Sequence, residues 1–371
     1  MTVADFRISL IDLQQRFHEE RAELLACVER VLESGHFVLT PELNAFEEKV
    51  AAYTGAKHCI GLNSGTDALM IGLMAMGITR GDEVITSPIS FVASTGSIAH
   101  VGGTPVYADV RDDQNIDPAE IEKKITPRTK AIMPVHWTGR ISDMNAIQEI
   151  ADRHGLMIIE DSCQSMGATY HGRHGGTFGA VGTFSAHPLK ALNATGDAGF
   201  MITSDDKIAE TARRYRNHGL VDRDTCLDYG VNSRLDILQA EILLYRLGRL
   251  ASITERRRHN VNLYRKLITA PEVFIPPCQA HEVNPFVMFL IQAERRDELK
   301  AHLESKGIMS LIYYGTPLHL QPAAKRYGYK RGDFPNAERQ ADQVLALPHH
   351  QHLTEDEIAE VAGEVNAFYG A

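Results

Sequence analysis

The sequence has few cysteines, no excess of positive charge and no long apolar run. Its five cysteines lie far apart and include no Cys-x-x-Cys pair, so neither a disulfide framework nor a cysteine zinc site is expected. The 38 basic side chains are outnumbered by 48 acidic ones, giving a net charge of −10. A general nucleic-acid binder is excluded because displacing counterions from phosphates requires a basic face. A local basic pocket for a small anion is still compatible with this charge.

Membrane and export signals are also lacking. The longest apolar stretch, residues 68–78, is too short to span a bilayer. The first residues, Met1–Arg7, have neither the basic start nor the apolar core of a signal peptide. Together with the scattered cysteines, these features lead us to expect a cytoplasmic protein with no membrane partner.

Short apolar runs alternate with helical patterns between about residues 58 and 205. The expected strands are 58–62, 83–86, 104–107, 131–135, 156–159, 179–185 and 199–203, and the expected helices are 68–76, 91–100 and 144–154. Continuous apolar runs separated by helices indicate a parallel sheet that is covered on both faces. We therefore predict an α/β fold with a mostly parallel central sheet flanked by helices.

The pattern changes in the last third of the chain. Helical periodicity covers 208–217 and then 235–267, and the paired prolines 276–277 mark a boundary because proline cannot continue a helix. A strand at 287–291 and helices at 296–306 and 354–368 predict a smaller C-terminal α+β domain. We predict a large domain over residues 1–250 and a small one over 251–371, with about residues 1–30 packing on the small domain.

Ser64-Gly65-Thr66 stands between an expected buried strand and an expected helix. A glycine there lets backbone N–H groups approach a phosphate at the positive end of the helix. An ordinary N-cap explains the same residues. The segment matches neither the dinucleotide fingerprint nor the P-loop.

Two further positions suggest chemistry. Asp161 ends a buried strand, where ligands bind in open α/β sheets, and its carboxylate could pair with a cationic ring nitrogen. The alternative is an acid that caps the next segment, and Gln164 could face the same ligand. Lys190 lies in a turn between two strands, close to Ser185, and a lysine held there could act as a nucleophile with a lowered pKa. Taken alone, Lys190 is an ordinary surface lysine.

In combination these signals resemble the layout of a pyridoxal 5'-phosphate (PLP) enzyme of the aspartate-aminotransferase fold type I. Five segments resemble, in order and spacing, the PLP-dependent nucleotide-sugar aminotransferases of the DegT/StrS group: Asn63–Leu69, Gly81–Ile85, Ile159–Gln164, His187–Lys190 and Asn232–Asp236. The resemblance extends over nearly the whole chain, from about Leu10 to Glu355.

The resemblance implies a role for each matched position around the cofactor. Lys190 corresponds to the catalytic lysine that holds PLP covalently and moves the proton, and Asp161 to the partner of the ring nitrogen. Gln164 corresponds to the residue near the ring hydroxyl, and Phe91 to the aromatic that stacks on the ring. A core residue that opens a helix is the alternative for Phe91.

The phosphate positions match as well. Gly65, Thr66 and Ser185 correspond to phosphate-binding residues. Asn232 corresponds to a residue that reaches across a dimer interface to the PLP phosphate, so the resemblance implies a homodimer with shared active sites.

The implied reaction moves an amino group, from L-glutamate, onto a keto-sugar that is linked to a nucleotide. Alternatives are an amino-cyclitol or non-nucleotide keto-sugar aminotransferase, or a non-catalytic regulator that retains the fold. Lys190 argues against the related dehydratases, which carry histidine there. The substrate-site candidates are His36, Phe37, Tyr313 and His319.

Three positions depart from the family pattern: Ala186, Trp137 and Gly315. We expect them around the substrate, where they bear on which sugar is bound. The histidines at 349, 350 and 352 suggest a metal site, but no further ligands complete a tetrahedral set, so no metal is expected. Residues 255–258 are expected to form a solvent-exposed helix face, with attraction of an anionic nucleotide as the alternative.

Overall fold

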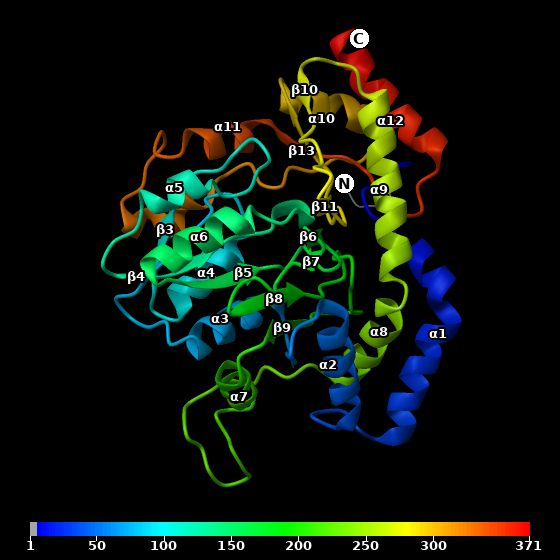
Figure 1. Ribbon diagram of the computed structural model, residues 1–371. Helices are drawn as coiled ribbons and strands as arrows, with labels where there is room; N and C mark the ends of the chain where they lie inside the picture. The colour runs from blue at the N-terminus through cyan, green and yellow to red at the C-terminus, as the bar shows by residue number, and fades with distance from the viewer. Residues whose placement is uncertain (1–5) are drawn as a thin grey trace.

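The computed structural model describes residues 6–371. Its centre is a seven-stranded sheet in the order β1-β9-β8-β5-β4-β2-β3, with helices on both faces (Figure 1). The strands are β1 His58–Leu62, β2 Glu83–Thr86, β3 Thr104–Tyr107, β4 Thr129–Met133, β5 Met157–Asp161, β8 Val181–Ser185 and β9 Gly199–Thr203. Strand β9 runs in the direction opposite to that of the other six strands of this sheet. The predicted α/β architecture is confirmed.

Apolar side chains on alternate positions of the strands point to opposite faces, and each face is covered by its own helices. One face packs against the first set, α3 Gly65–Ala75, α4 Val92–His100 and α7 Asp206–Tyr215. The other packs against α2 Pro41–Thr54, α5 Pro118–Glu122, α6 Met144–His154 and α8 Ile237–Leu247. Burial on both sides explains why these strands are apolar runs rather than alternating ones.

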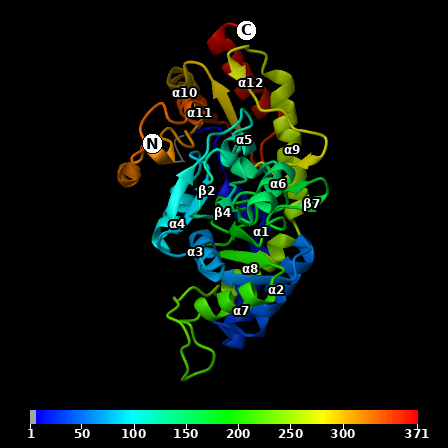
Figure 2. The ribbon, with the colours of Figure 1, turned by 60° about the vertical axis from the view of Figure 1, so that its left-hand side comes forward.

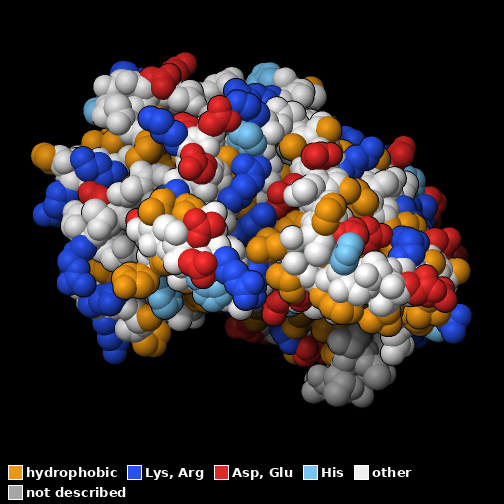
Figure 3. Space-filling view, turned by 90° about the horizontal axis from the view of Figure 1, so that it is seen from below, with side chains coloured by type: hydrophobic (Ala, Val, Ile, Leu, Met, Phe, Trp, Pro, Cys, Tyr) orange, Lys and Arg blue, Asp and Glu red, His pale blue; other side chains and the backbone are white. Residues whose placement is uncertain are grey.

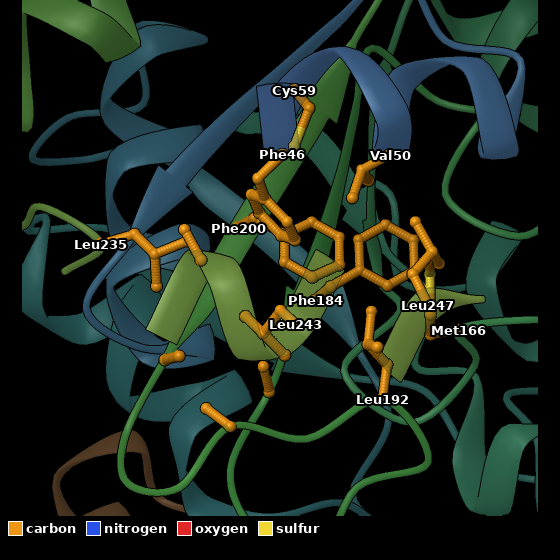
Figure 4. Packing of buried hydrophobic residues seen from close by; sticks show 14 of the residues in the cluster. Phe46, Val50, Cys59, Met166, Phe184, Leu192, Phe200, Leu235, Leu243 and Leu247 are labelled. Carbon is orange, nitrogen blue, oxygen red and sulfur yellow. The ribbon is translucent and has the colours of Figure 1, made fainter. Parts of the chain in front are cut away.

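Aromatic packing fixes the edge of the sheet that carries β1, β9 and β8. Phe184 of β8 and Phe200 of β9 stack with ring centroids 5.0 Å apart, and Phe46 of α2 meets Phe200 edge-on at 5.7 Å (Figure 4). All three rings are buried. Each contributes on the order of 1.5–3 kcal/mol through burial, which holds the end of β8 firmly in place.

The C-terminal part forms a second, smaller unit of structure around an antiparallel sheet, β10-β12-β13. Its elements are α9 Leu250–Leu267, β10 Val273–Phe274, β12 Leu290–Ala293, α10 Arg296–Ser305, α11 Pro335–Gln343, β13 Val344–Ala346 and α12 Glu355–Tyr369. Helix α9 rises along one side and joins the two parts (Figures 1 and 2). The prediction of one helical stretch over 235–267 is wrong at Gly248–Arg249, where α8 ends and α9 begins; glycine is a weak helix former.

Two segments tie the parts together. A short sheet pairs β11 Glu282–Val283 with β6 Thr169–Tyr170, which in turn pairs with β7 Arg173–His174. Ile8 pairs with Ile308, and α1 Leu13–Ser34 lies along α8 (Figure 1). Residues 1–5 of the expected N-terminal segment lie outside the described residues, and the domain division at residue 250 stays a prediction.

The chain between α7 and α8 projects from the body as a long loop in both views (Figures 1 and 2). Its Tyr229 side chain is 96% exposed. In residues 6–371, no helix combines the length and the hydrophobicity required to cross a membrane.

Candidate active site

A cavity of about 440 Å³ opens where β5 and β8 end and α3 begins. This is the carboxyl edge of the parallel strands, the usual ligand site in such sheets. The cavity is also lined by Met288, Tyr314 and His349 from the C-terminal part, and by Leu10 near the N-terminus. Eight residues predicted from the sequence line it: Gly65, Thr66, Phe91, Asp161, Gln164, Ser185, Lys190 and Tyr313.

Asp161 lies at the last position of β5 with its side chain 5% exposed. Ser94 of α4 donates its hydroxyl proton to Oδ2 at 2.6 Å, and the Cys163 backbone N–H donates to Oδ1 at 3.2 Å. Ser90 lies 2.6 Å from Ser94, oxygen to oxygen. The bond from Cys163 is the expected local capping contact. The bond from Ser94, which lies on α4, fixes the carboxylate in one orientation.

Lys190 lies in the turn between β8 and β9. Its backbone N–H donates to the His187 carbonyl at 2.8 Å, and the Asn193 amide donates to the Pro188 carbonyl at 2.6 Å. The lysine side chain is half-buried and lines the cavity, so the surface alternative does not hold. Burial lowers the pKa of the Lys190 amine, against the opposing effect of Cys163 and Asp161. A lowered pKa increases the neutral, nucleophilic fraction at neutral pH.

The start of α3 forms an anion cradle. Ser64 accepts the Asp67 N–H at 3.0 Å, so the N-cap alternative is confirmed for this residue. The N–H groups of Gly65 and Thr66 precede the first intrahelical bond, from Ala68 to Ser64, and stay available. A Cβ on Gly65 would lie 2.8 Å from both the Cys163 Sγ and the Ser185 Cβ, so only glycine allows this close approach.

These residues fit a bound PLP. The free N–H groups at the start of α3 and the Ser185 hydroxyl suit its phosphate, while the Asp161 carboxylate and the Lys190 amine suit its ring. The buried Gln164 side-chain oxygen has no hydrogen-bond partner among the described residues. An unsatisfied buried amide in a cavity wall indicates a polar ligand.

His319 does not line the cavity, contrary to expectation. It is buried among aromatic side chains, with Phe334 at a ring-centroid distance of 4.7 Å, and its Nε2 is 3.0 Å from Glu338 Oε1. Ala186 and Trp137, expected around the substrate, are also buried outside the lining. A match to a family motif predicts which segment lies near the site, but it does not predict the direction in which each side chain of that segment points.

His36, Phe37 and Asn232 lie on the outer surface of the chain, away from the cavity lining. Phe37 is half-exposed, and His36 Nδ1 is 2.9 Å from Glu42 Oε1. The backbone carbonyl of Asn232 accepts a hydrogen bond from the side-chain amide of Asn63 at 3.0 Å, and the side chain of Asn232 is exposed. The single chain therefore does not bring these three side chains to the cavity.

Sequence reasoning missed several lining residues. Ser90 lies in the bend before α4 and Ser94 lies in its first turn, and which turn of this helix faces the cavity is set by packing rather than by a local sequence signal. Tyr314, Met288 and His349 reach the cavity only through the packing of the C-terminal part, for which the sequence carries no local signal.

Comparison with known proteins agrees with this geometry. The family model DegT/DnrJ/EryC1/StrS aminotransferase family matches residues 18–366. The dTDP-3-amino-3,4,6-trideoxy-alpha-D-glucose transaminase of Streptomyces venezuelae is 42% identical over 94% of this chain and 92% of its own. A "pleiotropic regulatory protein" of Geobacillus stearothermophilus is 40% identical over 98% of both chains.

Solved structures agree as well. The crystal structure of S. venezuelae DesV in complex with a ketimine intermediate matches with a TM-score of 0.96 and 40% identity, over 98% of this chain and 99% of that one. NtdA from Bacillus subtilis with bound cofactor PMP matches with a TM-score of 0.88 and 31% identity, over 98% and 84%. These matches confirm the predicted fold type I, PLP as cofactor and aminotransferase activity. The chain belongs to the DegT/DnrJ/EryC1/StrS aminotransferase family.

Proposed function

We propose that this chain transfers an amino group from L-glutamate onto a keto-sugar linked to a nucleotide. The observation that carries the proposal is the placement of Lys190 and Asp161 in one cavity beside the anion cradle of α3. Relatives named for dTDP- and UDP-linked amino sugars support the sugar assignment. Bound PLP supplies an electron sink for the charge that develops at the reacting carbon.

Each site residue has a definite task in this proposal. The Lys190 amine holds the cofactor and moves a proton at the substrate carbon. Asp161, oriented by Ser94, keeps the ring nitrogen protonated. Gly65, Thr66 and Ser185 bind the phosphate, Gln164 contacts the ring hydroxyl, and Phe91 covers the ring face.

The remaining predicted residues fit a homodimer that shares its sites. Phe37, Val221 and Leu227 are apolar side chains that the single chain leaves at least half-exposed, and a partner subunit would bury them. Asn232 lies in the projecting loop between α7 and α8, as Val221 and Leu227 do. In the proposed dimer, Asn232 reaches the partner's PLP phosphate and His36 and Phe37 border the partner's substrate, while Tyr313 borders the cavity of its own chain. All five cysteines are unpaired, which supports a cytoplasmic location.

The test uses the purified protein with PLP. L-Glutamate alone should remove the visible absorption band of the cofactor and release 2-oxoglutarate in proportion to enzyme sites. A panel of nucleotide-linked keto-sugars should restore the band and yield an amino-sugar by mass spectrometry. If ordinary 2-oxo acids are aminated as efficiently as every keto-sugar in the panel, the sugar assignment fails while the PLP assignment survives.

A regulator that retains the fold is the second candidate, because relatives carry regulatory names. The presence of both Lys190 and Asp161 in the lining of the cavity favours catalysis. A protein that binds PLP but leaves the band unchanged with every amino donor would support the regulator.

A further inference from the structure

Arg257 is a buried arginine that has no acidic partner within residues 6–371. It lies on α9 within residues 255–258, and the expected solvent exposure of that segment is wrong for this residue, whose surface is 7% exposed. Its Nε donates to the neutral Gln351 side-chain oxygen at 3.3 Å. The neighbouring Arg258 is exposed, as expected.

Arg257 lines a small recess beside the active-site cavity. The recess is also lined by Asp12, Arg16, Leu189, Lys190 and His350. Its wall is continuous with the cavity, because Leu189, Lys190 and His349 line both. A group that enters this arginine recess therefore lies next to the amine of Lys190.

Three buried donors of the recess have no acceptor among the described residues: Arg16 Nη2, Arg257 Nη1 and His350 Nε2. The His350 Nδ1 accepts the His352 N–H at 3.3 Å. Burial lowers the pKa of His350 to about 4, so the ring is neutral and carries its proton on Nε2. Unsatisfied buried donors are rare in folded proteins and indicate a missing acceptor.

The charge of this region is only partly compensated. Glu20 is shared by three arginines, at 3.2 Å from Arg16, 2.8 Å from Arg246 and 3.3 Å from Arg249, and Glu19 lies 3.8 Å from Arg249. The one carboxylate of the recess lining, Asp12, accepts the Gln15 N–H at the start of α1. Within residues 6–371, Arg257 forms no ion pair.

Both recess arginines stay charged at neutral pH, although burial lowers the pKa of each to about 10. Arg16 has Glu20 as its counterion, whereas Arg257 has none within residues 6–371. A buried charge without a counterion is strongly destabilising, so Arg257 requires a negative group. Water satisfies donors but supplies no charge. The free volume of about 20 Å³ holds on the order of one or two water-sized groups, which suits a carboxylate better than the larger diphosphate.

We propose that the arginine recess binds a carboxylate of the amino-acid donor, with Arg257 as the principal cation and Arg16 and His350 as further donors. Its position beside Lys190 places the donor's amine at the reacting centre while the nucleotide-sugar uses the open part of the cavity. This inference rests on the proposed function and deepens it, because it assigns the donor its own subsite.

The test measures ligand binding to the PLP-loaded protein by calorimetry. Glutarate serves as a non-reacting dicarboxylate, and dTDP and UDP serve as nucleotide probes. In Arg257→Met the affinity for glutarate should fall at least tenfold, and in Arg257→Lys part of it should return, because the charge is kept. Affinity for dTDP and UDP should stay within twofold in both variants.

Arg258→Met is the matched control, since it makes the same change one position along and outside the recess; it should bind glutarate normally. Melting temperature and PLP content establish folding, and Arg257→Gln replaces the Met variant if that fails to fold. Equal glutarate affinity in wild type and variants would overturn the proposal, as would loss of nucleotide affinity alone or an equal loss for all ligands. No nucleotide-sugar is required, so a failed sugar panel leaves this result intact.

Discussion

The floor of the cavity and the outer face around the projecting loop are built in opposite ways. On the floor, Asp161 receives hydrogen bonds from Ser94 and Cys163, and each contact is complete within one chain. On the outer face, Tyr229 and Leu227 are exposed. Seen from below, the surface that carries this loop shows groups of hydrophobic side chains between charges of both signs (Figure 3). The floor is complete within a single chain, whereas the outer face leaves apolar side chains exposed, which the proposed partner subunit would cover.

The largest effect should come from Lys190→Ala. Loss of the amine removes both the attachment of the cofactor and the proton transfer, a contribution of at least about 10²–10⁴-fold for a positioned acid–base group. Turnover measures the loss. Borohydride treatment of the PLP-loaded wild type, followed by peptide mapping, should mark Lys190; a mark on another lysine would end this assignment.

Asp161→Asn should come next. The amide keeps the size of the side chain but loses the charge that holds a proton on the ring nitrogen, so the barrier rises by several kcal/mol, each ~1.4 being tenfold. Steady-state kinetics on protein with full PLP content check this. Ser97→Ala, whose hydroxyl donates only to the Ser94 carbonyl, is the control and should keep turnover. Near-normal turnover of the Asp161 variant would contradict its role.

The outer face is tested by mixing the weakened Asn232→Ala variant with the inactive Lys190→Ala variant. Asn232→Ala alone should cost about tenfold through one lost hydrogen bond to a charged group. Random exchange with Lys190→Ala subunits should raise activity from about a twentieth to about a quarter of wild type, since a two-fold hybrid regains one intact site.

Exchange is verified with differently tagged chains. The control mixture, Lys190→Ala with Asp161→Asn, should stay inactive, because both residues lie in one chain's site. If verified hybrids with Asn232→Ala stay at about a twentieth of wild-type activity, the two regions are independent and the contrast drawn above is wrong.

The smallest change is Gly65→Ala. The added Cβ would lie 2.8 Å from Cys163 Sγ and Ser185 Cβ, and such overpacking lowers the free energy of unfolding by about 1–3 kcal/mol. Urea denaturation measures it, with PLP retention as a second readout. Gly363→Ala in α12 is the control: a Cβ there meets nothing within 4 Å, so stability should rise by about 0.5–1 kcal/mol. If Gly65→Ala has the same free energy of unfolding as the wild type, α3 can shift enough to accommodate the added Cβ.

The sequence was sufficient where local pattern decides structure. Strands 58–62, 83–86 and 199–203 and helix 144–154 have the predicted bounds, because buried strands and an amphipathic helix have distinct periods. The strand predicted at 131–135 instead ends at Met133, before a proline that cannot donate to the ladder. The two-residue strand β11 is too short for any period to show.

The site residues also differ in how far the sequence predicts them. The lysine, the aspartate and the α3 start each follow a strand at the same sheet edge. Their positions alone left a surface lysine and ordinary caps open, and the resemblance of the motifs to a family decided the prediction. Ser94 and His349 depend on which turn of a helix or loop faces inward, and His319 shows the converse: a residue in a matching segment that points into an aromatic cluster. The burial of Arg257 was not predicted, because a run of charged residues is expected to be exposed when only its composition is considered.

The position of β9 has a consequence for how the chain acquires its structure. Edge strand β1 pairs only with β9, and His58 meets Thr203 across 145 residues. At roughly 5–20 residues per second of synthesis, β1 waits about 7–30 s before its partner leaves the ribosome. The backbone of Ser64 and Gly65 then closes against Gly199, where a Cβ would come within 2.2 Å of Ser64. The anion cradle of α3 thus cannot close before β9 has emerged, and the nascent chain carries an unpaired apolar strand until then.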